Sequence, residues 1–255
     1  MVERAPLNRL TDIDRFYWLL DELSQRIGGT RTLADLKRFR DWPSRGVYFF
    51  FEPSEFRSDS GRAPRVVRIG THALGLGSHS TLRQRLGQHR GSLSGGGNHR
   101  GSIFRLLVGQ ALLAKGSLAS CASWGVKGTA AKASTYLGID RGQLVSGEAP
   151  VEQAVSAYLS SLPFLWVGVD DEPSPDSQRG FIERNVIGLL SNYGHAVIDP
   201  PSADWLGRAS NRVRVLGSGL WNQQHVDEIY DPTFLGILES MVTTNYQTVG
   251  FERRG

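Results

Sequence analysis

Cysteine is almost absent from this 255-residue sequence, and Cys121 is its single example. One cysteine excludes an internal disulfide and any zinc cage built from cysteine ligands. Long apolar runs are also missing, because none approaches the ~20 residues that cross a bilayer. Residues 1–6 lack the basic-then-apolar layout of a secretion signal. These absences predict a protein of the reducing cytoplasm with no membrane partner.

Acidic residues are absent from residues 60–139. The same stretch holds eleven basic residues, namely Arg62, Arg65, Arg68, Arg83, Arg85, Arg90, Arg100, Arg105, Lys115, Lys127 and Lys132. Because the formal net charge of the whole chain is only +4, the remainder is net negative. Such a separation of charge is typical of a surface that binds a polyanion, and arginine suits bidentate phosphate contacts. The charge pattern therefore predicts nucleic acid as the partner.

Hydrophobic residues make up 40% of the chain, which predicts a packed globular core in one large domain or two small ones. Two β-branched and aromatic runs, residues 46–51 and 65–70, predict neighbouring strands with a polar loop over residues 52–64 between them. The apolar run 162–169 predicts a third strand in the centre of the sheet.

Apolar periodicity and capping residues predict helices over residues 11–27, 33–40, 80–90, 102–114, 150–159, 177–193 and from 231 onward. Thr11 is the expected N-cap of the first helix, which Gly28-Gly29 ends. Gly194 is the expected end of the sixth. Residues 116–147 give no clear pattern.

The helix predicted over residues 80–90 carries Arg85 and His89 four positions apart, along the edge of a stripe formed by Leu82 and Leu86. A guanidinium and an imidazole are therefore expected together above the sheet.

Glu183 falls inside the apolar arc of the helix predicted over residues 177–193, between Val186 and Ile187 on a helical wheel. A charged carboxylate in that position needs a cation or a strong donor. The residues alone leave two interpretations open, a structural glutamate paired with an arginine or a metal ligand.

The triplets Gly46-Val47-Tyr48 and Arg68-Ile69-Gly70, followed by Arg85-x-x-x-His89 and then by Glu183 and Asn192, resemble the GIY-YIG nuclease family. The sequence departs from the family at Arg68, where a tyrosine is expected. The resemblance implies an α/β fold in which a small antiparallel or mixed central sheet is flanked by helices.

The resemblance also divides the chain into three parts. An N-terminal helical layer is expected over residues 1–45. The nuclease core follows over residues 46–195 and includes a basic insertion at about 105–160. Residues 196–255 are expected to form a C-terminal helical extension packed on the core.

In such a nuclease, Glu183 would hold one Mg²⁺ or Mn²⁺ ion, which neutralises charge developing on the scissile phosphate. Tyr48 would act as general base or position the attacking water, a role that needs Arg68 or Arg85 nearby to favour the phenolate. Arg85 would clamp the phosphate, and His89 would orient or relay the proton. Asn192 stands where the family has an asparagine of the site.

Further contacts to nucleic acid are predicted from residues of the basic stretch, namely His99, Arg100, Lys127 and Lys132. For His99, a plain loop histidine is an equal alternative. Trp124 and Tyr136 add aromatic rings to this region. They either lie along a nucleic-acid backbone and stack on bases or form a small satellite core, and the sequence favours neither.

The resemblance predicts a divalent-metal-dependent endonuclease that hydrolyses phosphodiester bonds in DNA, in a restriction-like or defence role. RNA as a substrate and a homodimeric state both stay open. The alternatives are a nucleic-acid-binding module that does not cut, and a nuclease of repair or RNA processing. An intact set of Tyr48, Arg85, His89 and Glu183 argues against the binding module.

Overall fold

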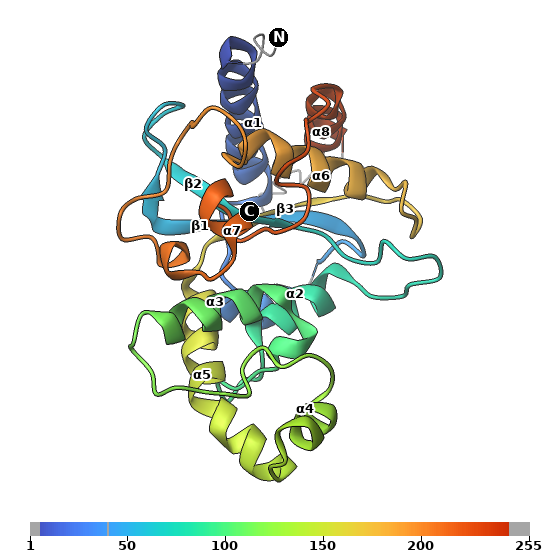
Figure 1. Cartoon of the computed structure of the whole chain (residues 1–255). Coiled ribbons are helices and arrows are strands. Elements are labelled where there is room, and N and C mark those ends of the chain that lie inside the picture. The colour runs from blue at the N-terminus through green and yellow to red at the C-terminus, as the bar shows by residue number, and fades with distance from the viewer. Residues whose placement is uncertain (1–5, 40, 245–255) are drawn as a thin grey trace, which may run out of the picture.

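The computed structural model describes residues 6–39 and 41–244 and is built around a small antiparallel sheet (Figure 1). Its strands are β1 (Gly46–Phe56), β2 (Pro64–Gly70) and β3 (Phe164–Gly168), in the order β2-β1-β3. The central strand is therefore β1, and the prediction that residues 162–169 form the centre is wrong. Strand β3 is fully buried although it lies at an edge, because helices cover its faces and Arg31 pairs with Phe164 beyond it.

Helices cover both faces of the sheet (Figure 1). One face carries α1 (Pro6–Ile27), α6 (Gln178–Leu190) and α8 (Thr233–Thr244). The other face carries η1 (Leu33–Lys37), α2 (Leu82–Arg90), α3 (Ile103–Ala114) and α5 (Arg141–Ser161). The remaining helical elements are η2 (His99–Gly101) before α3, α4 (Ala130–Leu137) against α5, and η3 (Leu206–Ala209) with α7 (Val213–Ser218) beside α3. This arrangement confirms the predicted fold class.

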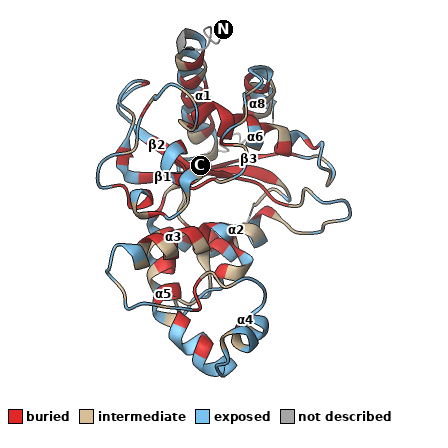
Figure 2. Cartoon of the chain, viewed as in Figure 1, coloured by how far each residue is buried: buried red, intermediate tan, exposed pale blue. Residues whose placement is uncertain are grey.

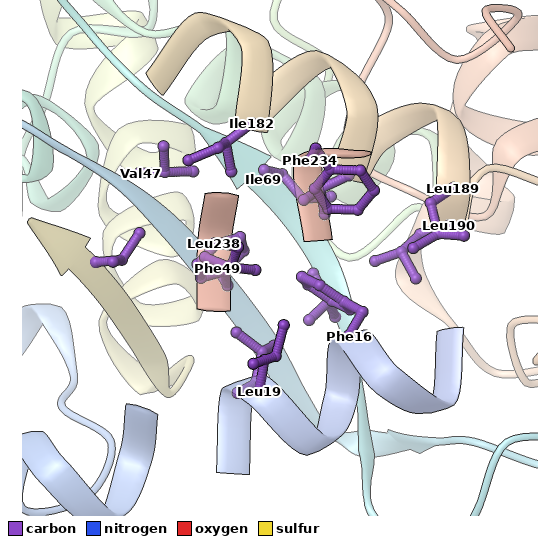
Figure 3. Close-up of a cluster of buried hydrophobic side chains, with 14 of the residues drawn as sticks. Phe16, Leu19, Val47, Phe49, Ile69, Ile182, Leu189, Leu190, Phe234 and Leu238 are labelled. Carbon is purple, nitrogen blue, oxygen red and sulfur yellow. The ribbon is translucent and has the colours of Figure 1, made fainter. Parts of the chain in front are cut away.

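Alternate side chains of β1 serve the two layers, as the pleat of a strand requires. Val47 and Phe49 enter the core against α1, α6 and α8, where Ile69 and Ile182 also lie (Figure 3). Tyr48 and Phe50 enter the opposite core, against α2 and α3. The pleat thus turns Tyr48 toward the helix that carries Arg85 and His89.

Residues 91–161 form a helical lobe, which includes η2, α3, α4 and α5. Burial decreases along this lobe with distance from the sheet, and α4 is mostly exposed at its far end (Figure 2). Among the helices of the described ranges, none combines the length and the apolarity needed to cross a membrane.

Several predicted boundaries are confirmed and others are wrong. Helices α2 and α3 lie where they were predicted, and α1 ends before Gly28 and Gly29, whose φ angles are +75° and +91°. Strand β1 continues to Phe56 instead of ending at residue 51, because the acids of its second half have buried partners. Glu55 accepts hydrogen bonds from Arg65, and Glu52 accepts one from Trp205 Nε1 at 3.1 Å.

Three helix ends differ from the prediction. Helix α1 begins at Pro6, so Thr11 lies inside it and is not an N-cap. Helix α5 begins at Arg141 behind the Asp140 cap, so Pro150 lies in its interior. Helix α6 ends at Leu190, before Gly194. Arg40 and residues 1–5 and 245–255, which belong to the predicted N-terminal layer and C-terminal extension, lie outside the described residues.

Candidate active site

The glycines of the two triplets are explained by close contacts across the sheet. A Cβ atom on Gly46 would lie 2.4 Å from the carbonyl oxygen of Val167 on β3. A Cβ atom on Gly70 would lie 2.3 Å from the hydroxyl oxygen of Tyr48, the residue that faces Gly70 across the β1–β2 pair. The first glycine therefore allows β3 to approach β1, and the second leaves room for the Tyr48 phenol.

Tyr48 and His89 form the centre of the site. Tyr48 Oη lies 2.8 Å from His89 Nε2, and His89 Nδ1 lies 2.8 Å from Oγ of Ser102, the N-cap of α3. Burial, with the Arg85 guanidinium nearby, holds the pKa of His89 well below its ordinary value, so the imidazole is neutral at pH 7. In the tautomer with its proton on Nδ1, Nε2 is free to accept the Tyr48 proton.

Arg68, which replaces the family tyrosine, lies on the same face of the sheet as Tyr48 and is almost fully buried. Its Nη1 donates a hydrogen bond to the carbonyl oxygen of Trp221 at 2.6 Å, and its guanidinium lies 5.6 Å from the Phe104 ring centroid. Burial lowers the pKa of Arg68, while the charges of Tyr48 and Glu183 oppose that shift. Arg68 thus supplies a positive charge that acts on both Tyr48 and Glu183.

Arg85 lies on the outer edge of α2 and is partly exposed. Its Nη1 donates to Gln88 Oε1 at 3.0 Å and to the carbonyl oxygen of Gly101 at 3.4 Å. Within residues 6–39 and 41–244 it forms no ion pair with an acid. Its charge is therefore available to an anionic ligand.

Glu183 reaches the same end of the sheet from α6. Its Oε1 accepts a hydrogen bond from the Thr71 backbone N–H at 3.2 Å, and Thr71 Oγ1 donates to the Gly46 carbonyl oxygen at 2.8 Å. Thr71 therefore ties the helix that carries Glu183 to the first residue of the first triplet. Burial raises the pKa of Glu183, and the charges of Arg68 and His225 oppose the rise. A further positive charge beside Glu183 would stabilise its charged carboxylate.

The donor set fits an open divalent-metal site. Mg²⁺ keeps several waters and binds to protein through one or two carboxylates, so a single glutamate with one backbone hydrogen bond suffices. No three His, Cys, Asp or Glu side chains gather into a closed cage anywhere in the described part of the chain. Asp171, one of the acids in the loop before α6, is paired with Arg179.

Asn192 serves a turn after α6. Its Nδ2 donates to the Ile198 carbonyl oxygen at 3.0 Å, and its Oδ1 accepts from the Ile198 N–H at 3.0 Å and from Arg9 at 3.3 Å. These bonds fix the chain just beyond the helix that carries Glu183. Any role of Asn192 in the site would act through that helix.

Sequence reasoning missed residues 221–225, which run along the outer edge of β2. The Trp221 N–H donates to the Val67 carbonyl oxygen at 2.7 Å. The Asn222 amide accepts from the Ile69 N–H at 3.1 Å and donates to the Ile69 carbonyl oxygen at 2.9 Å. This segment supplies the carbonyl group that holds Arg68. No local sequence pattern indicated this backbone pairing.

The residues predicted to contact nucleic acid fall into two groups. His99 is buried, its N–H and Nδ1 lie 2.6 Å and 3.0 Å from Glu152 Oε1, and Arg100 pairs with Glu148 through two contacts of 2.7 Å. Lys127 and Lys132 are exposed and have no acidic partner in the described ranges. The structure brings none of the four into hydrogen-bond contact with Tyr48 or Glu183.

The two aromatic residues of this region also separate. Trp124 is buried, its ring centroid lies 3.9 Å from that of His99, and its Nε1 donates to the Leu106 carbonyl oxygen. Tyr136 is 80% exposed. The satellite core therefore contains Trp124, while Tyr136 remains open to a ligand.

The basic stretch is partly neutralised by acids from elsewhere in the chain. Arg65 pairs with Glu55, Arg100 with Glu148, and Arg105 with Glu152. Arg105 is fully buried and also donates to the His89 carbonyl oxygen at 2.8 Å, which links the helical lobe to α2. The exposed basic surface is therefore smaller than the sequence indicates.

Comparison with known proteins gives one match. A family model described as "GIY-YIG domain" matches residues 7–248, nearly the whole chain. The search of curated proteins and the search of solved structures each gave no match. The chain therefore belongs to the GIY-YIG family, whose members are generally endonucleases that act on nucleic acid with a divalent metal ion.

Proposed function

We propose that this protein is a divalent-metal-dependent endonuclease that hydrolyses phosphodiester bonds in DNA. The observation that carries the proposal is the grouping of one acid–base pair and one carboxylate at the same end of the sheet. Tyr48 Oη lies 2.8 Å from His89 Nε2, and Glu183 is held by the Thr71 N–H. The buried Arg68 acts electrostatically on both groups.

In this proposal, Glu183 would hold a Mg²⁺ or Mn²⁺ ion, and the bound ion would supply positive charge against the scissile phosphate. Tyr48 takes a proton from the attacking water as its own proton passes to His89 Nε2. A bond forms between the water oxygen and phosphorus while the bond from phosphorus to the leaving sugar oxygen breaks. That oxygen leaves with the bonding electron pair and takes a proton from solvent water. Arg85 binds the phosphate oxygens, and Arg68 stabilises negative charge on the Tyr48 oxygen.

The remaining predicted residues receive supporting roles. Lys127 and Lys132 contact the nucleic-acid backbone, because each is exposed and lacks an acidic partner in the described ranges. Arg100 and His99 hold the wall of the helical lobe through Glu148 and Glu152. Asn192 is a positioning residue at the end of α6.

We place this activity in restriction or defence. The helical lobe inserted between α2 and β3 gives the nuclease core nucleic-acid contacts of its own, as a restriction-like enzyme requires. A repair or RNA-processing nuclease is the alternative. A preference for RNA over DNA would favour RNA processing, and a preference for damaged or branched DNA over an intact duplex would favour repair.

The test replaces Glu183 with Gln, which keeps the size of the side chain and removes its charge. Glu183→Gln should lower the rate of plasmid cleavage in Mg²⁺ or Mn²⁺ by about 10² or more, while binding to DNA without metal persists. Glu172→Gln is the matched control, because this acid lies just before α6 and its side chain is 89% exposed. A Glu183→Gln protein that loses thermal stability but still cuts DNA would make Glu183 a structural residue and overturn the proposal.

A further inference from the structure

A groove lies on the helical lobe directly behind the candidate active site. Its volume is ≈ 780 Å³, and it is lined by residues 96–98, 100–101, 128–130 and 132 together with residues from the first half of α5. This volume falls within the range of roughly 300–1,000 Å³ that is usual for ligand pockets. A groove of the size that usually holds a small ligand admits a short unpaired stretch of nucleic acid but not a whole duplex.

One wall separates the groove from the catalytic groups. Gly101 lines the groove, and its carbonyl oxygen accepts the hydrogen bond from Arg85. The next residue, Ser102, contacts His89 Nδ1 at 2.8 Å. A strand that leaves the phosphate bound at Arg85 therefore has the groove immediately beyond it.

The groove carries net positive charge once its ion pairs are counted. Both of its acids are paired, Glu148 with Arg100, and Glu152 with His99 and the buried Arg105. Burial alone would raise the pKa of Glu152, but the hydrogen bonds from His99 and Arg105 outweigh burial and hold that pKa below its ordinary value. The negative charges of Glu148 and Glu152 are therefore balanced by the basic residues that they pair with.

Lys132 and Arg141 also line the groove, and both are exposed. Neither has an acidic partner in residues 6–39 or 41–244. Their charge is thus free to act on a phosphate in the groove.

Tyr136 places an exposed aromatic ring on the same helix as Lys132. Tyr136 lies four positions after Lys132 in α4, so the two side chains share one face of the helix. Tyr136 is 80% exposed, although burial of the ring would stabilise the fold. Positive charge along a groove next to an exposed aromatic ring is the arrangement by which proteins bind single strands.

We propose that this groove binds an unpaired strand of the nucleic acid next to the cleaved phosphodiester, with Lys132 and Arg141 on its phosphates and Tyr136 stacked on a base. The substrate would then be a nucleic acid with a single-stranded segment at the cleavage site. This inference rests on the proposed nuclease function, because it assigns the groove a strand next to the cleaved bond. Its test measures binding alone and needs no cleavage.

The test measures binding of the full-length protein in EDTA, so that no cleavage is needed. The probes are a blunt DNA duplex, the same duplex with a single-stranded branch, a DNA single strand and an RNA single strand, each followed by fluorescence anisotropy. Tyr136→Ala should weaken binding to the branched and single-stranded probes by roughly tenfold. Lys132→Ala and Arg141→Ala should each reduce the salt dependence on a single strand by about 0.7 units of slope.

Lys115→Ala is the matched control, because Lys115 is exposed at the end of α3 and does not line the groove. It should leave the preference for unpaired probes unchanged. Equal losses on the blunt duplex and on the unpaired probes would overturn the proposal, and so would no loss on any probe. Tighter binding of RNA than of DNA through the same residues would support the groove and identify RNA as its strand.

The two proposals can fail separately. Absence of metal-dependent cleavage by the unaltered protein would refute the nuclease and leave the binding result intact. The Tyr136, Lys132 and Arg141 variants would refute only the proposal for the groove if they cut plasmid normally and bound unpaired strands as tightly as the unaltered protein.

Discussion

A methyl group added at Gly70 would test whether the contact between Tyr48 and His89 drives catalysis. The Gly70 φ lies outside the left-handed region, so alanine fits the backbone without strain. Its Cβ would stand 2.3 Å from Tyr48 Oη, whereas ordinary van der Waals contact begins at 3.4 Å. The phenol oxygen must therefore retreat by about 1.1 Å.

His89 has no freedom to follow this movement. Its ring is fully buried between Phe50 and Phe104, and Ser102 holds its second nitrogen at 2.8 Å. The hydrogen bond to Tyr48 is therefore stretched or lost. A displacement of about 1 Å at a reacting group costs roughly 10² in rate, or about 2.7 kcal/mol of activation free energy. The added volume should also destabilise the fold by about 1–3 kcal/mol.

The assay compares single-turnover cleavage of supercoiled plasmid with thermal unfolding and with DNA binding in EDTA. Gly70→Ala should lose about 10² in cleavage rate and keep its affinity. Gly87→Ala is the control, because this glycine lies in α2 between Arg85 and His89 and its added Cβ meets no atom within 4 Å. The control should cut normally and gain about 0.5–1 kcal/mol of stability. A folded Gly70→Ala protein that cuts at the unaltered rate would refute the role given to the Tyr48 oxygen.

Two further predictions concern the site, and a third concerns His72, a buried residue next to Thr71 in the sequence. Arg85→Ala should lower turnover by about 10² or more with a modest change in affinity, because Arg85 acts on charge that develops in the transition state; equal losses in both would make it an ordinary phosphate contact. EDTA should abolish cleavage and leave DNA binding, and Mn²⁺ or Mg²⁺ should restore the rate; cutting in EDTA would exclude the metal role of Glu183. Burial lowers the pKa of His72 from 6.5 to about 4. Between these two pH values, His72 is protonated in the unfolded chain but not in the folded chain. The free energy of unfolding therefore decreases as the pH falls from 6.5 to 4. His72→Gln should therefore make urea stability depend less on pH between 7 and 4.5, and an unchanged dependence would contradict this cause.

Features with local causes could be predicted from the sequence. The stripe of Leu82 and Leu86 places His89 against the sheet, and both leucines are fully buried. The triplet glycines mark where β1 approaches β3 and where the Tyr48 phenol lies over β2. These features depend on residues that are near in sequence or that share a strand pair.

Features with distant causes could not be predicted. The apolar sequence of β3 is typical of a central strand. The strand lies at an edge of the sheet and is buried as fully as a central strand, because Arg31 pairs with Phe164 and helices cover both faces. Arg68 is held by a carbonyl group 153 positions away. The count of basic residues gave no information on the acids that pair with Arg65, Arg100 and Arg105, because those acids lie outside the acid-free stretch.

The long sequence separations within the site have a consequence for the cell that makes this protein. Thr71 and Glu183 are 112 positions apart, and Arg68 and Trp221 are 153 positions apart. A ribosome adds about 5–20 residues per second, so Glu183 and Trp221 emerge on the order of ten seconds after β2. During that interval, Tyr48 and His89 are present in a nascent chain that still lacks Glu183 and the Trp221 carbonyl group that binds Arg68. On the proposed mechanism, a product truncated before α6 lacks Glu183 and should not cut nucleic acid.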